Sequence, residues 1–294
     1  MIIDRKFKRF LVMVVLFDAH THIGKWDTGE NSFSREDLFD VLDKNAVEYF
    51  VVSNLNGIGI DSSKPDFTPF LPEKEANEEL IRTFSHFPQA VLLAVCEPRH
   101  GSPRALEYLL KKHPGKFAGL KFHSEANRIP ANSELYDGYM EIAKKHDLPC
   151  LFHSGSIKSA YSSPELIYEL AQRHPEVRVI LGHLSCGDLD SKIKAVEIMW
   201  ESICQNNSQL YADFSWCQWN VLIEMIKIFA NNLDRIMFGS DAPMGNMRDP
   251  EMYNAFANSL MDKIEETFPD CGDELIQLLF YENAKSLFKI RRIK

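Results

Sequence analysis

The hydrophobic positions of this chain fall into short continuous runs, separated by longer stretches in which apolar and polar residues are mixed. A continuous apolar run of four to eight residues is typical of a parallel strand buried on both faces, whereas a half-exposed strand alternates. Eight runs each predict a strand: about Leu11 to Ala19, VEYFVVSN from Val47, AVLLAVCEP, KFAGLKFH, PCLFHSG, VRVILGH, LYADFSW, and DRIMFGSD ending at Asp241.

The stretches between these runs predict helices. SREDLFDVLDKN has an N-cap candidate in Ser34, and Asp37 follows three residues later, as in a capping box. Pro103 and Pro164 stand where two further helices are expected to begin, because proline is favoured in the first helical turn. We expect two more helical segments to end the chain, around residues 251–267 and 273–288.

Strict alternation of eight strands with helices favours the α/β class and a (β/α)8 TIM barrel. The 294 residues suit one such barrel, which typically needs about 250 residues. We therefore expect a single barrel domain over residues 1–294, completed by C-terminal helices. An open doubly wound sheet of eight units is the alternative, and the placement of polar residues described below disfavours it.

Composition narrows the class of protein further. The net charge of -9 argues against a broad nucleic-acid-binding face. The six cysteines form no C-x-x-C pair, and several lie in apolar runs, which indicates a reduced cytoplasmic protein. Basic residues before FLVMVVLF imitate a signal peptide, but no small-residue cleavage site follows, and Met13 is an alternative start. No stretch approaches the ~20 apolar residues of a membrane span.

Polar residues stand at or just beyond the carboxyl ends of the predicted strands. In a (β/α)8 barrel these ends converge on one mouth, where active sites are built. Residues i and i+2 of a strand point the same way, so His20 and His22 can face one ion together. Imidazoles with a carboxylate suit Zn²⁺ and its neighbours in the first transition row. The candidates are His20, His22, His153, His183 and Asp241.

Each of these residues has a plain structural explanation when it is taken alone. A His-x-His pair can lie on a solvated strand, His183 can be a hydrogen-bonded core histidine, and Asp241 can cap a turn. Their shared position at strand ends is what favours a common site.

The motifs FDAHTHIG, GLKFH, LFHSG, VILGH and MFGSDAP together resemble the amidohydrolase superfamily, in its branch of amidohydrolase-related hydrolases and decarboxylases. The resemblance covers almost the whole chain and ends at ENAKSLF, Glu282 to Phe288. It implies a barrel of the metal-dependent hydrolase type. It also implies that His20, His22, His153 and Asp241 bind one divalent metal ion, with Zn²⁺ expected and Mn²⁺ as the alternative. Asp241 would accept the proton of the attacking water, and His183 would lie close to the water or substrate.

Strand four departs from one pattern of the superfamily. Binuclear members carry a carbamylated lysine there, which Lys121 imitates, whereas the single-metal branch has an unmodified lysine near the substrate. That branch usually follows its strand-four histidine with proline, but Ser124 follows His123 here. We expect Lys121 to be unmodified and to bind substrate with His123 and with Arg99, which follows strand three; a structural ion pair for Lys121 is the alternative.

The resemblance implies a metal-dependent hydrolase that attacks a C–O or C–N bond of a small carbonyl compound, such as a lactone, ester or amide. The competing hypothesis is non-oxidative decarboxylation of an aromatic or enoic acid, in which basic residues such as Arg248 would help to bind the anion. A non-catalytic metal-binding scaffold or sensor is a third hypothesis. Trp216, Cys217 and Trp219 follow strand seven, where they either wall a pocket or cap the barrel. The expected partners are a small-molecule substrate and a second copy in a homodimer, with no nucleic acid and no membrane.

Overall fold

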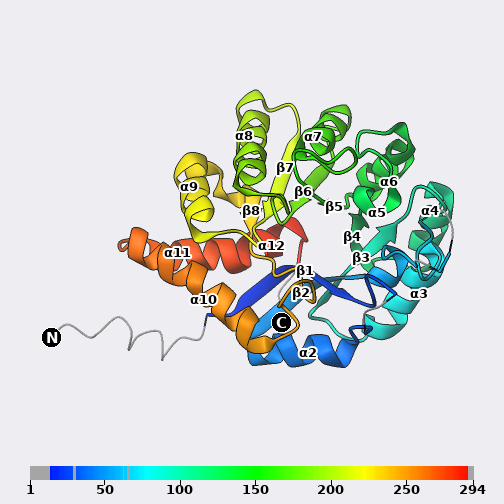
Figure 1. Cartoon of the computed structure of the whole chain (residues 1–294), viewed down its shortest axis with the longest axis horizontal. Helices are drawn as coiled ribbons and strands as arrows, with labels where there is room; N and C mark the ends of the chain where they lie inside the picture. Colours follow the sequence, from blue (N-terminus) through cyan, green and yellow to red (C-terminus); the bar gives the residue numbers. More distant parts are fainter. Residues whose placement is uncertain (1–13, 29–30, 62, 65–66, 291–294) are drawn as a thin grey trace.

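A computed structural model of the chain describes residues 14–28, 31–61, 63–64 and 67–290. Eight parallel strands follow one another in sequence order around a barrel, which confirms the predicted fold (Figure 1). They are β1 Leu16–Ile23, β2 Val47–Asn54, β3 Ala90–Cys96, β4 Phe117–Phe122, β5 Cys150–His153, β6 Arg178–Gly182, β7 Gln209–Asp213 and β8 Ile236–Met237.

The barrel closes between its last and first strands. Ala19 N donates to Phe238 O at 2.9 Å, Asp241 N donates to His20 O at 2.8 Å, and His22 N donates to Ala242 O at 2.7 Å. The backbone after β8 thus pairs with β1, although only two residues of β8 belong to the regular ladder with β7.

Helices form a ring outside the strands, and α10 lies between α9 and α2, where it covers the closing side of the barrel (Figure 1). The helices are α2 Arg35–Lys44, α3 Glu73–Phe84, α4 Pro103–Lys112, α5 Ser124–Asn127, α6 Asp137–His146, α7 Pro164–Arg173, α8 Leu189–Gln205, α9 Trp219–Phe229, α10 Pro250–Thr267, α11 Gly272–Gln277 and α12 Asn283–Leu287. Short 3-10 turns are η1 Leu55–Gly57, η2 Glu134–Tyr136 and η3 Ala230–Arg235, and η4 Leu278–Glu282 is a π-helical turn. Of the helices in the described ranges, none is both long and apolar enough to cross a membrane.

The inside of the barrel is apolar toward the amino ends of the strands, here called its lower side, and polar toward their carboxyl ends, at the mouth. The lower cluster includes Phe17, Tyr49, Leu93, Ile180 and Met237, and residues of η4 and α12 close it from beneath. Side chains point inward at every second position of a strand: on β7, Tyr211 packs against the lower cluster, and Asp213, two residues further, lies near the mouth.

β1 contains an irregularity that decides which side chains reach the mouth. Between Asp18 and Thr21 it advances three residues while β2 advances two, so β1 carries one extra residue there. This bulge changes the phase of the strand. Phe17 points into the lower core, Asp18 bonds outward to Tyr253 of α10, and His20 and His22 both face inward.

Several predicted boundaries were wrong, including that of LYADFSW, whose strand β7 ends at Asp213. The described part of β1 runs to Ile23 rather than ending at Ala19, because His20 and His22 lie within a strand that is hydrogen-bonded on both sides; the predicted residues from Leu11 to Met13 lie outside the described ranges. β8 stops as a regular strand at Met237, because Phe238 N donates to Leu279 O of η4 at 2.8 Å instead of continuing the ladder with β7. The predicted helix over 273–288 is interrupted by the π turn of η4.

Candidate metal centre

Three of the predicted ligands meet above the apolar core of the barrel. Asp241 Oδ1 lies 3.3 Å from Nε2 of His20 and 3.1 Å from Nε2 of His22. All three side chains are buried, and their ligand atoms lie within 4.8 Å of one another. The arrangement gives two imidazole nitrogens and one carboxylate oxygen facing a common point, which is the donor set of a small divalent transition metal.

Asp213 decides which nitrogen His20 presents to this point. His20 Nδ1 lies 3.0 Å from Asp213 Oδ2. Burial opposes ionisation of Asp213, but His20 and the hydroxyl of Ser215 lower the pKa of Asp213 to about 2. An ionised carboxylate only accepts hydrogen bonds, so the proton of a neutral His20 stands on Nδ1 and the lone pair of Nε2 faces Asp241.

His22 has a comparable partner on β2. Its Nδ1 lies 2.7 Å from the hydroxyl of Ser53. Burial lowers the pKa of His22 to about 3, so the ring is neutral near pH 7. Burial alone would raise the pKa of Asp241, but His20 and the hydrogen bond with His22 lower it well below its usual value. A neutral imidazole next to an ionised carboxylate is the state in which both groups bind metal.

A second cluster of imidazoles adjoins this trio. His153, the last residue of β5, lies with Nδ1 3.1 Å from His183 Nε2 and stacks on His123 with ring centroids 3.8 Å apart. Burial lowers the pKa of all three rings, that of His183 to about 3. His153 does not join the trio whose ligand atoms lie within 4.8 Å.

His183 carries an open polar atom. Its backbone adopts a φ of 48° and its N–H donates to Asp213 Oδ1 at 2.9 Å. Among the described residues, Nδ1 of His183 is buried and has no hydrogen-bond partner. A buried imidazole nitrogen of this kind is free to bind water or a polar group of a ligand.

Lys121 of β4 extends into the site from the opposite wall. It is almost completely buried, and its Nζ lies 2.7 Å from His20 Nε2. Burial lowers the pKa of Lys121 to about 8, against the attraction of Asp241 and Asp213. The lysine is therefore largely a cation near pH 7, and its ammonium lies next to the same nitrogen of His20 that faces Asp241.

Arg99 lies further from the centre. Its Nε donates to Asn127 O at 2.8 Å and its Nη2 donates to Arg128 O at 3.1 Å. The guanidinium also lies 6.0 Å from the ring centroid of Phe67. These bonds tie Arg99 to the backbone that follows β4, so the structure does not bring it into the cluster with the other predicted residues.

Several residues that hydrogen-bond to His20, His22 or Asp241 were not predicted from the sequence. Asp213 ends β7, and Asp18 accepts from His20 N at 3.1 Å and from Ser240 N at 3.0 Å. Trp216 Nε1 donates to Asp241 Oδ2 at 3.0 Å. A carboxylate at the end of a buried apolar run was the available signal for Asp213. Neither Ser53 nor the contact of Trp216 had a signal of this kind.

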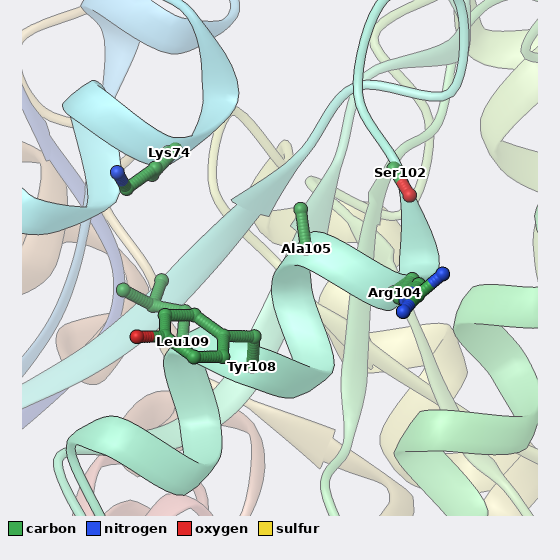
Figure 2. Close-up of a pocket in the computed structure, with 6 residues that line it drawn as sticks. All are labelled: Lys74, Ser102, Arg104, Ala105, Tyr108 and Leu109. Atoms are coloured by element: carbon green, nitrogen blue, oxygen red, sulfur yellow. The ribbon is translucent and has the colours of Figure 1, made fainter.

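A pocket elsewhere on the molecule contains no comparable group of imidazoles and carboxylates. It has a volume of about 380 Å³ and lies along α4, where Lys74, Ser102, Arg104, Ala105, Tyr108 and Leu109 line it (Figure 2). The charged ends of Lys74 and Arg104 lie on opposite sides of it (Figure 2). None of the predicted site residues lines this pocket.

Comparison with known proteins gives the family of the chain. A family model described as amidohydrolase matches residues 17–290, from the start of β1 to beyond α12. No curated protein matches the chain.

Solved structures share the whole fold. A 2,6-dihydroxybenzoate decarboxylase from Rhizobium superimposes with a TM-score of 0.67 at 16% identity, over 95% of this chain and 99% of its own. A structure of 2,6-dihydroxybenzoate decarboxylase in complex with 2,6-dihydroxybenzoate gives 0.67 at 16%, over 94% and 98%. A Pseudomonas putida protein provisionally named 2-pyrone-4,6-dicarboxylic acid hydrolase gives 0.62 at 13%, over 95% and 99%. At this level of identity the likeness establishes the fold.

Proposed function

The chain belongs to the amidohydrolase family, and we propose that it is a metal-dependent hydrolase acting on a C–O or C–N bond of a small lactone, ester or amide. The observation that carries the proposal is the convergence of His20, His22 and Asp241. Asp241 Oδ1 lies within 3.3 Å of a nitrogen of both histidines. Two imidazole nitrogens and one carboxylate oxygen that converge in a buried site form a donor set suited to one small divalent cation.

The residues present fit one divalent ion, and we propose Zn²⁺, with Mn²⁺ as the alternative. His20, His22 and Asp241 would hold it, and His153 is the proposed fourth ligand from the adjoining cluster. A divalent ion bound here would supply a Lewis acid that polarises a carbonyl group and makes hydroxide available near neutral pH.

The side chains around this point can transfer a proton and stabilise the negative charge that develops on the substrate. Asp241 is buried and ionised, so its carboxylate can accept a proton from water and return it to the leaving group. The free Nδ1 of His183 and the ammonium of Lys121 can bind the carbonyl oxygen on which negative charge develops. His123 and Arg99 are the proposed outer contacts of the substrate.

Decarboxylation is the second candidate, and one observation favours it. Lys121 places a buried cation within 2.7 Å of His20, where it would attract the carboxylate of an aromatic or enoic acid. The decarboxylases with the same fold show that this barrel accommodates such chemistry in other proteins. In this alternative Lys121 would orient the carboxylate, and Asp241 would serve mainly as a ligand.

Product analysis separates the two reactions. Metal-loaded protein is incubated with a panel of lactones and esters, with acid release as the readout, and with a panel of hydroxybenzoates, with carbon dioxide release as the readout. Acid release that Asp241→Asn abolishes would support hydrolysis, and carbon dioxide release would replace it by decarboxylation. A metal-loaded protein that is inert on both panels would favour the third hypothesis, a metal-binding scaffold or sensor.

Three further proposals concern the compartment, the class of substrate and the oligomeric state. We propose that the protein acts in the cytoplasm on a small-molecule substrate, which cell fractionation and the panels test. Homodimer formation stays a prediction, which light scattering on the purified protein tests.

A further inference from the structure

The turn after β7 has an unusual backbone at Trp216. This residue has a φ of 59°, a conformation that bulky side chains rarely adopt. The turn is anchored by Asp213, whose Oδ1 accepts hydrogen bonds from both the backbone N and the hydroxyl of Ser215. Backbone strain persists where surrounding contacts over-determine it, and such positions cluster at functional sites. The strained turn places the indole of Trp216 at the mouth of the barrel.

The indole contacts the metal centre through one oxygen. Trp216 Nε1 donates to Asp241 Oδ2 at 3.0 Å, while Asp241 Oδ1 faces the nitrogens of His20 and His22. The indole N–H is a donor and never an acceptor, so Oδ2 of Asp241 accepts this bond. The two oxygens of Asp241 therefore have different partners: Oδ2 contacts the indole, and Oδ1 contacts the two histidines.

The loop that follows Asp241 is shaped around the same ring. Gly245 has a φ of 57°, and a Cβ on this residue would overlap the six-membered ring of Trp216. The ring therefore fills a notch that exists only because residue 245 has no side chain. Trp216 is 36% exposed, so its outer edge lies at the surface of the mouth while its N–H is directed inward.

We propose that Trp216 is a positioning residue for the metal centre: its N–H holds Oδ2 of Asp241, so that Oδ1 is the oxygen presented to the bound cation. The inference rests on the proposed metal site and adds to it the residue that orients its carboxylate ligand. Partners that orient a ligand typically contribute a factor of about 10 to 100 in metal affinity. Among the residues that the structure describes, no side chain other than Trp216 donates a hydrogen bond to Oδ2.

The test uses the intact protein and two variants that act on the contact from opposite sides. Trp216→Phe keeps an aromatic ring and removes the N–H, and Gly245→Ala fills the notch and displaces the ring. Trp219→Phe is the matched control, since Trp219 is exposed at the start of α9 and does not bond to Asp241. Zn²⁺ affinity is measured by competition with a chromophoric chelator, Co²⁺ coordination by visible absorption, and apo-protein stability by urea unfolding.

We expect both variants to bind Zn²⁺ about 10-fold more weakly or worse and to change the Co²⁺ spectrum, with the Trp219→Phe protein unchanged. If Trp216→Phe does not fold, Gly245→Ala decides the question by the same readouts. Variants that bind Zn²⁺ and Co²⁺ as the parent protein does would overturn the role of Trp216 and leave the metal site intact. A parent protein that binds neither ion would instead refute the proposed function itself.

Discussion

At the scale of single residues, the proposed histidine ligands are oriented by side chains that bond to their other ring nitrogen, Nδ1. Asp213 bonds to Nδ1 of His20, and Ser53 bonds to Nδ1 of His22. Asp213 also accepts from the backbone N–H of His183 and of Ser215. One buried carboxylate thus orients a ligand and ties down the two turns that carry His183 and Trp216.

Replacement of this carboxylate by its amide should weaken metal binding. In Asp213→Asn the amide oxygen can still accept from His183 N, but the amide NH₂ would then face His20 Nδ1. His20 would have to carry its proton on Nε2, where a metal needs the lone pair. We expect Zn²⁺ affinity to fall about 10- to 100-fold in chelator competition.

The control is Asp188→Asn, because Asp188 caps α8 at an exposed position and asparagine caps a helix equally well. Equal Zn²⁺ affinities for Asp213→Asn and Asp188→Asn would contradict the role given to Asp213.

Some residues of the site could be predicted from the sequence, and others could not. His20, His22 and Asp241 could be grouped because the carboxyl ends of barrel strands meet at one mouth. Asp213 lies at such an end too, but a carboxylate inside LYADFSW was taken as part of the strand. The bond from Trp216 depends on a φ of 59° and on the notch at Gly245, and no periodic pattern reports either.

At the scale of elements, buried polar groups join helices to strands. Glu73 begins α3, and its Oε2 accepts from Glu97 N beyond β3 at 2.8 Å and from the hydroxyl of Tyr139 on α6 at 2.7 Å. Burial raises the pKa of Glu73 to about 7, although these hydrogen bonds oppose the shift. The carboxyl group is therefore partly protonated in the folded protein near neutral pH.

This raised pKa predicts a pH dependence of stability. Between the ordinary value of 4.5 and about 7, the folded protein holds a proton on Glu73 that the unfolded chain releases. The free energy of unfolding should fall as pH rises through this window, by up to about 3 kcal/mol in total. Below the window the carboxyl is protonated in both states, and above it the loss is complete.

Glu73→Gln removes this titration and keeps an acceptor for Glu97 N. Urea unfolding at several pH values between 4.5 and 8 should show the variant gaining stability relative to the parent as pH rises. Glu75→Gln, exposed on the same helix, should run parallel to the parent. A Glu73→Gln profile that also runs parallel would show that Glu73 does not titrate in this window.

Element boundaries show where sequence patterns fail. Ser34 caps α2 and forms the predicted capping box with Asp37, because that signal is local. β8 was predicted to extend to Asp241, yet only Ile236 and Met237 pair regularly with β7. The apolar pattern continues through Phe238 because these residues are buried, and burial does not require a regular ladder.

At the scale of the whole molecule, the barrel is closed below by the C-terminal segment. η4 and α12 contribute Tyr281, Ala284, Leu287 and Phe288 to the lower core with Phe17 of β1. Asn283 fixes this segment, since its Nδ2 donates to Leu233 O and to Ile236 O, each at 2.7 Å. The match to the ENAKSLF motif therefore corresponds to a structural role at the floor of the barrel.

Asn283→Ala should destabilise the protein as a whole. It removes two hydrogen bonds and leaves two backbone carbonyls without their partner in a buried place. We expect the free energy of unfolding to drop by about 2 kcal/mol in urea titrations. Asn254→Ala, on the exposed face of α10, should change it by less than about 0.5 kcal/mol. A loss as small as that of the control would mean that the floor of the barrel does not depend on Asn283.

The proposed function depends on the binding of one divalent ion at the barrel mouth by His20, His22 and Asp241. The most direct test is plasma mass spectrometry of metal content in protein purified without added metal. Three proteins are compared: the parent, the double variant His20→Ala/His22→Ala, and His86→Ala, which alters an exposed histidine outside the cluster. We expect about one zinc or manganese ion per chain in the parent and the His86 variant and none in the double variant. A parent protein without metal, even after reconstitution with both ions, would contradict it.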